Sequence, residues 1–121
     1  MSLDPLDGTR WALEYISLGG ISHMVNGRRI PEIAFVDGRV SADDGVNLAE
    51  GTYSWDGNIF DTSVSATTSL HYPDEVLPEY DLFEHLAEVR SAVMHGDFLH
   101  LRFGRSTDEL VYRYEAEGAP A

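Results

Sequence analysis

Cysteine is absent from the 121-residue sequence, which excludes a disulfide framework, a thiolate zinc site and a cysteine nucleophile. Lysine is absent as well, so all eight basic residues are arginine. No stretch approaches the roughly 18 apolar residues of a membrane span, and MSLDPLDGTRW lacks the basic and apolar regions of a signal peptide. The chain as given is therefore predicted to be soluble and not inserted in a membrane. Its compartment stays open between the cytoplasm and, if a signal peptide was removed, the periplasm or the extracellular space.

Positive charge is scarce, because 8 basic residues stand against 21 acidic ones and give a formal net charge of -13. Nucleic acid and an anionic membrane surface would both repel such a chain, so neither is expected as a partner. With 43% apolar and 11% aromatic residues, the chain can fill one ordinary core. We expect a single domain over residues 1–121, with its core in about residues 7–115 and flexible termini.

Segments with the alternating apolar pattern of β-strands recur at short intervals. Asp37-Gly38, Asp56-Gly57 and Gly96-Asp97 each separate two such runs and are predicted hairpin turns. This spacing predicts a mainly β fold, a small antiparallel β-barrel or split barrel. The strand-like segments are TRWALEYI, IAFVDGRVS, GTYSWDGNIF, SVSATTSL, FLHLRF and ELVYRYEA.

The first of these segments shows which face is expected to be buried. Trp11, Leu13 and Tyr15 form one alternating set, and we predict that this set faces the core. The stretch from Gly19 to Pro31 has no clear pattern and is expected to be a mobile loop or an irregular edge hairpin.

One segment, PEYDLFEHLAEVR, has the period of a helix instead of a strand. Its apolar residues recur at helical spacing on a charged background, which predicts a single amphipathic helix packed against the barrel. Pro78 suits the first turn, and Glu79, Asp81 and Glu84 place negative charge near the positive end of the helix dipole. The apolar stripe consists of Leu82, Phe83, Leu86 and Val89.

Five short motifs in a fixed order resemble the META domain, the HslJ-like heat-shock lipoprotein family. In chain order they are Gly8-Thr9-Arg10-Trp11; Pro31, Ile33 and Phe35; Gly45 to Tyr53; Thr67 or Thr68; and Gly96 to Leu101. The resemblance covers nearly the whole chain, from Asp7 to about Tyr114. Val46 stands where the family commonly has a cysteine, and Leu70 and His71 lie where its second common cysteine is expected. Any disulfide function of the family is therefore absent here.

The resemblance implies a bacterial protein whose family is associated with stress response, drug resistance and motility or secretion. It supplies no catalytic residues. We therefore expect a non-enzymatic, stress- or envelope-associated interaction module of undefined biochemical activity. The acidic surface and an exposed strand edge are the expected contact regions.

Five histidines invite a metal or acid–base hypothesis: His23, His71, His85, His95 and His100. No H-x-H or H-x-x-x-H pair occurs, so surface or hydrogen-bonded structural histidines are the favoured interpretation. The acidic stretch from Asp74 to Asp81 could hold a carboxylate pair, but a solvated approach to the helix is favoured. No G-x-S-x-G motif is present. The sequence therefore predicts no catalytic, cofactor-binding or metal-binding residue and no cofactor.

The stretch DDGVNLAEGTYSWDG has the acids, amide and glycines of a calcium loop without its D-x-[DN]-x-[DN]-G pattern. We predict that it sets backbone geometry, as a turn and irregular crossing followed by a hairpin strand. Gly45 and Gly51 would permit positive φ or close backbone approach, and Asn47 would bond neighbouring backbone groups from inside. Val46 would pack in the core. The acids that begin the stretch, Asp43 and Asp44, are expected to be merely solvated.

Two kinds of partner remain open, another protein or a small apolar ligand, and so does the oligomeric state. The ligand alternative supposes a lipocalin-like barrel with a cavity of roughly 300 Å³ or more lined by aromatic rings. The rings that could line it are Trp11, Phe35, Tyr53, Trp55 and Phe103. Plain packing of these rings around the helix is the favoured interpretation.

Overall fold

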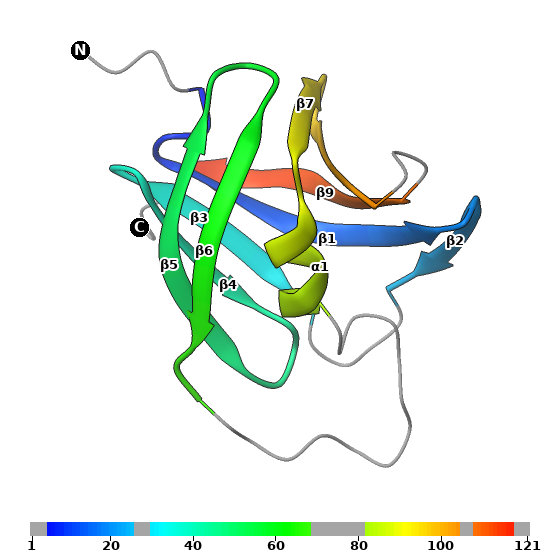
Figure 1. Cartoon of the computed structure of the whole chain (residues 1–121), viewed down its shortest axis with the longest axis horizontal. Coiled ribbons are helices and arrows are strands. Elements are labelled where there is room, and N and C mark those ends of the chain that lie inside the picture. The colour runs from blue at the N-terminus through cyan, green and yellow to red at the C-terminus, as the bar shows by residue number, and fades with distance from the viewer. Residues whose placement is uncertain (1–4, 26–29, 69–81, 105–107, 118–121) are drawn as a thin grey trace.

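The computed structural model describes residues 5–25, 30–68, 82–104 and 108–117 of the chain. Its described part is mainly β, with nine antiparallel strands in one sheet and one short helix (Figure 1). The strand order is β6-β5-β4-β3-β1-β9-β8-β7. β2 pairs with the second half of β1, whereas β3 pairs with the first half. The strands are β1 (Thr9–Leu18), β2 (Ile21–Met24), β3 (Glu32–Val36), β4 (Arg39–Asp43), β5 (Leu48–Trp55), β6 (Phe60–Ala66), β7 (Ser91–His95), β8 (Phe98–Phe103) and β9 (Asp108–Glu117).

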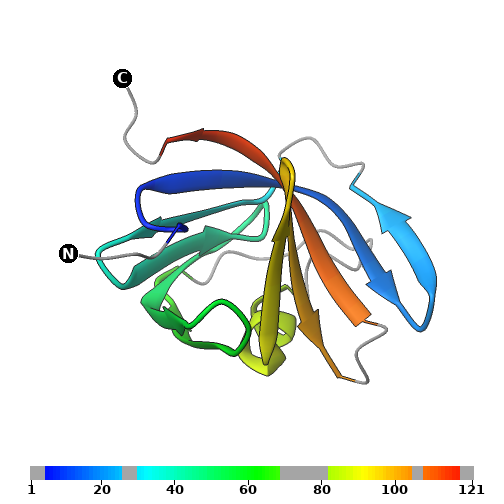
Figure 2. The ribbon, with the colours of Figure 1, turned by 90° about the horizontal axis from the view of Figure 1, so that it is seen from above.

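The sheet curls so strongly that its two end strands meet, as Figures 1 and 2 show from two directions. An isolated bridge joins Ile59, just before β6, to Ser91, the first residue of β7. There the Phe60 backbone N–H donates to the Arg90 carbonyl at 2.9 Å, and that of Ala92 donates to the Asn58 carbonyl at 3.0 Å. The Trp55 indole Nε1–H, on β5, donates to the Ala92 carbonyl at 3.2 Å. This short seam makes the sheet a split barrel, as predicted.

Helix α1 (Leu82–Glu88) packs between β6 and β8, beside the seam. Leu82 and Leu86 are fully buried, and so is Val89 just after the helix, while Phe83 is half-buried against the core. The predicted apolar stripe is therefore confirmed. The Thr62 hydroxyl of β6 donates to the Leu86 carbonyl at 2.8 Å and holds the last turn against the sheet. Three residues of the predicted helix start, Pro78, Glu79 and Asp81, lie outside the described residues.

The interior is filled by inward-facing side chains from most of the strands and by the helix. Phe35 packs edge-on against Tyr53 with ring centroids 4.7 Å apart, and Phe60 stacks on Tyr53 at 6.0 Å. Leu99 and Tyr112 are fully buried on the neighbouring strands β8 and β9. The Tyr112 hydroxyl is buried with no hydrogen-bond partner among the described atoms.

Residues Gly8 to Trp11 pin the start of β1 to the rest of the barrel. The Thr9 hydroxyl donates to the Leu6 carbonyl at 2.5 Å and accepts from the Trp11 indole at 2.8 Å. Gly8 has a φ of 80°, and its N–H donates to the Phe35 carbonyl at 2.7 Å. Trp11 is 2% exposed, and the prediction that it is buried is confirmed. The G-T-x-W motif is thus a local clamp with a buried aromatic end.

The predicted inward set of β1 is wrong at one residue. Trp11 and Leu13 face the core, but Tyr15 is half-buried and Ile16 is fully buried in its place. The cause is a β-bulge. Leu13 pairs with Tyr112 and Tyr15 pairs with Val111, which leaves Glu14 unpaired in the ladder with β9. The extra residue reverses the alternation for the second half of the strand.

The three predicted hairpin turns are confirmed. Asp37 and Gly38 have φ values of 51° and 77°, the positive values that a two-residue type I′ turn requires. The segment SVSATTSL, expected as a separate strand, instead continues the strand that begins at Phe60 and ends at Ala66. Residues 19–25 form a hairpin with β1, whereas 26–29 lie outside the described residues.

Candidate interaction surface

The turn at residues 43–47 holds itself in place through its own acids, so the prediction that these acids are merely solvated is wrong. Asp44 is 0% exposed, and its Oδ1 accepts from the backbone N–H groups of Val46 and Asn47 at 2.9 and 2.7 Å. The carboxylate of Asp43 accepts from the N–H groups of Gly45 and Glu32 at 2.9 and 3.2 Å. Both carboxylates bind backbone groups of the fold.

The remaining residues of this stretch also set backbone geometry. Asn47 is buried, as predicted, and its Oδ1 accepts from the Thr68 hydroxyl at 2.8 Å. Gly45 has a φ of 92°, and a Cβ on Gly51 would lie 1.8 Å from the Ser63 carbonyl oxygen, so positive φ and close backbone approach are both confirmed. Val46 is half-buried and lies outside the core cluster, so its predicted core position is wrong. Val46 belongs to the turn itself, where its N–H donates to Asp44.

The histidines lie on four separate elements, and His71 is outside the described residues. His85 stacks on Phe103 with ring centroids 4.8 Å apart, and His100 contacts Glu109 at 3.2 Å. His23 lies on β2, and His95 is exposed at the end of β7. In the described part of the chain, no three His, Asp or Glu side chains form a group that could hold a metal ion. The acidic stretch 74–81 lies outside the described residues.

Four charged side chains meet on the outer face of the barrel, where β9, β1, β3 and β4 run side by side. The pKa of Glu32 is raised to about 7, chiefly by burial and then by a hydrogen bond with Glu115 and the negative charge of Glu115. The Arg10 guanidinium opposes this change, whereas Asp43 adds to it. Glu115 is the unpaired residue of a second bulge, on β9. The pair of Glu32 and Glu115 could not be predicted from the sequence, because the two residues lie far apart along the chain.

This outer face has two shallow hollows. One, of about 250 Å³, is lined by Ala34, Val36, Asp37, Arg39, Val40, Ser41 and Glu50. The other, of about 130 Å³, shares Ala34 and Ser41 with it. No aromatic ring lines either hollow. Within the barrel, Trp11, Phe35, Tyr53 and Phe103 belong to the packed core. Their packing is what the favoured interpretation of these rings expects.

The hairpin formed by the end of β1 and by β2 extends beyond the curled body of the sheet (Figures 1 and 2). Ile21 is 64% exposed and Met24 62%, the two largest exposures among the described large hydrophobic side chains. Residues 21–24, ISHM, carry no acidic residue, arginine or proline. The only signal in the sequence is Gly19-Gly20 between two apolar runs, which is typical of a two-residue hairpin turn but says nothing about exposure.

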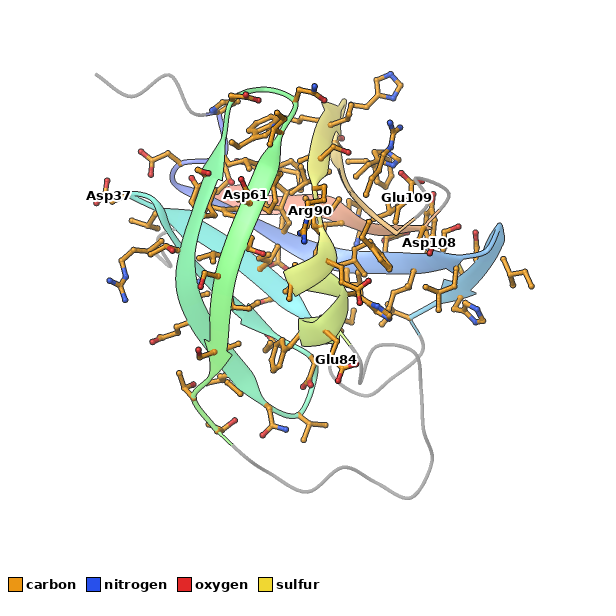
Figure 3. The ribbon with its side chains drawn as sticks, in the orientation of Figure 1. Asp37, Asp61, Glu84, Arg90, Asp108 and Glu109 are labelled. Carbon is orange, nitrogen blue, oxygen red and sulfur yellow. The ribbon has the colours of Figure 1, made fainter. Side chains whose placement is uncertain are left out.

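This hairpin is held to β9 by hydrogen bonds. The Gly19 N–H donates to the Asp108 carboxylate at 2.7 Å, and β1 pairs with β9 as far as Ser17 and Glu109. In Figure 3, Asp108 and Glu109 lie toward the β2 end of the molecule and Asp37 lies at the opposite end. Among described residues, β2 pairs with β1 alone. The hairpin therefore offers a strand with two exposed apolar side chains and with one edge unpaired in the described part of the chain.

Together, the split barrel, its single helix and its clamped G-T-x-W start define a class of small antiparallel β domains. The sequence matches the META domain over residues 4–117. The chain belongs to this family.

None of the curated proteins matches it in sequence. No helix in the described residues is long and apolar enough to cross a bilayer.

Solved structures share this fold. An NMR structure of a protein from Burkholderia xenovorans has a TM-score of 0.69 at 16% identity and covers 95% of this chain and 92% of its own. A crystal structure of a DUF4847 family protein from Bacteroides vulgatus has a TM-score of 0.63 at 12% identity, over 93% and 96% of the two chains. Another NMR structure has a TM-score of 0.63 at 22% identity, over 93% and 94%. At these identities the likeness is one of fold.

Proposed function

We propose that this META domain is a non-enzymatic interaction module that binds another protein through the β2 hairpin. The observation that carries the proposal is the exposure of Ile21 and Met24, at 64% and 62%, on a strand with an unpaired edge in the described structure. Natural edge strands are commonly protected by charge, proline or a covering element, because an exposed apolar edge invites another chain. An edge that lacks these protections in the described structure, on a strand paired with β1, suits a docking surface.

The non-enzymatic part of the proposal is supported by where the candidate catalytic groups lie. His85 is used in stacking and His100 in a contact with Glu109, on different elements. Asp43 and Asp44 bind backbone N–H groups of their own turn. These groups serve the fold, and they do not converge on one hollow.

The proposed role in stress or envelope physiology rests on the family resemblance alone. We expect the abundance of the protein in its source cell to rise after heat shock or envelope damage, as quantitative mass spectrometry would record. Constant abundance under both treatments would remove this part of the proposal and leave the docking surface to be tested separately.

The docking surface is tested with a library of random peptides displayed on phage and selected on the intact protein. We expect selected peptides to bind the wild type and to lose binding to Met24→Asp, which places a charge in the apolar strand. Val36→Asp is the matched control, because Val36 is 47% exposed beside the turn at the opposite end of the sheet. Peptides that bind Met24→Asp and the wild type equally would refute the assignment of this surface.

A further inference from the structure

We infer that β2 binds its partner by strand addition, in which an extended segment of a basic polypeptide becomes the next strand of the sheet beyond β2. The inference rests on the proposed function and specifies how that surface works and what it takes. It depends on the direction of the backbone groups of β2, on the side chains beside them and on the charge of the chain.

The register of the hairpin fixes which backbone groups of β2 point outward. The Val25 N–H donates to the Glu14 carbonyl at 3.3 Å, so these two residues form a hydrogen-bonded pair. In an antiparallel ladder, hydrogen-bonded and non-hydrogen-bonded pairs alternate. His23 and Ile21 therefore direct their backbone groups toward β1, whereas Ser22 and Met24 direct theirs away from it. An added strand can use both N–H groups and both carbonyls of these two residues.

The side chains of β2 suit an added strand because each face has an apolar residue. Ile21 pairs with Leu18 and lies on the same face as the buried Ile16, so it continues the apolar inner face of the sheet beyond the barrel. Met24 lies on the opposite face with Ser22. A segment with alternating side chains would cover an apolar residue on each side while its backbone pairs with the edge.

Charge decides between a basic partner and a second copy of the chain. Each copy has a formal net charge of -13, so two copies repel one another as they approach, whereas a basic segment is attracted. The described strand has four residues and two outward-facing ones, so few hydrogen bonds are available. The expected complex is therefore weak and transient, and its affinity should fall as salt is added.

The test uses a synthetic peptide of alternating lysine and valine, with an alternating glutamate and valine peptide as its charge control. Ser22→Pro and Met24→Pro each remove one outward-facing N–H and leave the hydrogen-bonded pairs with β1 intact. We expect each variant to raise the Kd for the lysine peptide about three- to tenfold, the loss that one hydrogen bond produces. Val36→Asp should bind it unchanged, and the glutamate peptide should not bind.

A second arm leaves the protein unaltered. Methylating every backbone nitrogen of the lysine peptide should abolish binding, because neither edge of the peptide can then donate to β2. Hydrogen exchange on the wild type should slow at the Ser22 and Met24 amides when the unmethylated peptide binds. These measurements decide the matter even if a proline variant fails to fold.

The outcomes separate the two proposals. If the methylated peptide and the proline variants bind normally while Met24→Asp does not, strand addition is refuted and the docking surface stands. If none of the β2 changes alters binding, both fail. Equal binding of the glutamate peptide, or an affinity that does not respond to salt, would refute the basic partner. A dimer seen by light scattering at low salt and lost in Met24→Pro would make a second copy the occupant.

Discussion

Replacing Asp44 with alanine should destabilise the domain strongly, although the sequence marks this residue as an ordinary turn acid. Its side chain is 0% exposed, and Oδ1 accepts from the N–H groups of Val46 and Asn47 at 2.9 and 2.7 Å. Alanine removes this shared acceptor and leaves both donors without it. The backbone bond from the Asp44 N–H to the Asn47 carbonyl, at 3.1 Å, remains possible but loses its side-chain support.

The expected magnitude follows from those two bonds. Each hydrogen bond to a carboxylate contributes about 1.5 to 3 kcal/mol, and a buried N–H left without an acceptor costs about 1 to 3 kcal/mol. Because Val46 is half-buried and water can reach part of the turn, we expect a loss of about 2 to 4 kcal/mol. That is a large share of the roughly 5 to 15 kcal/mol that stabilises a typical domain.

Urea denaturation followed by tryptophan fluorescence measures this loss as a lower midpoint at constant slope. Asp61→Ala is the matched control, because Asp61 is an exposed aspartate on β6 (Figure 3) and its replacement should stay within about 0.5 kcal/mol. Asp44→Asn keeps one carbonyl acceptor and should lose less than Asp44→Ala. If Asp44→Ala unfolds at the same urea concentration as the control, the carboxylate does not hold the turn and the reasoning is refuted.

Three further predictions concern other parts of the barrel. Gly51→Ala should destabilise by at least about 2 kcal/mol in the same assay, because its Cβ would lie 1.8 Å from the Ser63 carbonyl oxygen. Gly57→Ala, with a φ of 99° and open space around its Cβ, should lose only about 1 kcal/mol, and equal losses would contradict the steric argument. Tyr112→Phe should be neutral or stabilising, since the buried hydroxyl has no partner among the described atoms; a lower melting temperature would reveal a hydrogen bond there. The raised pKa of Glu32, about 7 against an ordinary 4.5, means that the folded state binds its proton more tightly, so its stabilising contribution is complete below pH 4.5 and is lost as the pH rises through 7. Between these values the melting temperature of the wild type should fall relative to Glu32→Gln, and a constant difference would contradict the shift.

The turns and the helix could be predicted because their signals are local. Asp37-Gly38 marks a hairpin by the positive φ that both residues must adopt, and the apolar stripe that includes Leu82 and Leu86 marks the helix by its period. The inward set of β1 could not be predicted fully, because the bulge at Glu14 depends on pairing with a strand at the far end of the chain. Alternation in the sequence carries no information about such a skipped partner.

The burial and hydrogen bonds of Asp44 and the exposure of β2 could not be predicted for a similar reason. An aspartate beside a glycine suits a solvated turn and a buried one equally, and only the course of the surrounding backbone decides which it is. For residues 19–31 the sequence leaves a mobile loop and an irregular edge hairpin open, and whether Ile21 and Met24 are covered depends on what lies beside them in space. Neither strand β2 nor its exposure could therefore be predicted from local pattern.

The position of β1 between β3 and β9 has a consequence for synthesis on the ribosome. Thr9 pairs with Glu117, so the first strand made waits for the last one before its ladder is complete. Contacts this distant in sequence slow folding, because a long loop must close before they form. Until β9 leaves the exit tunnel, the edge of β1 that faces β9 has no hydrogen-bonding partner. A nascent chain stalled before β9 should therefore bind holdase chaperones and be cut by proteases, whereas one released after it should resist both.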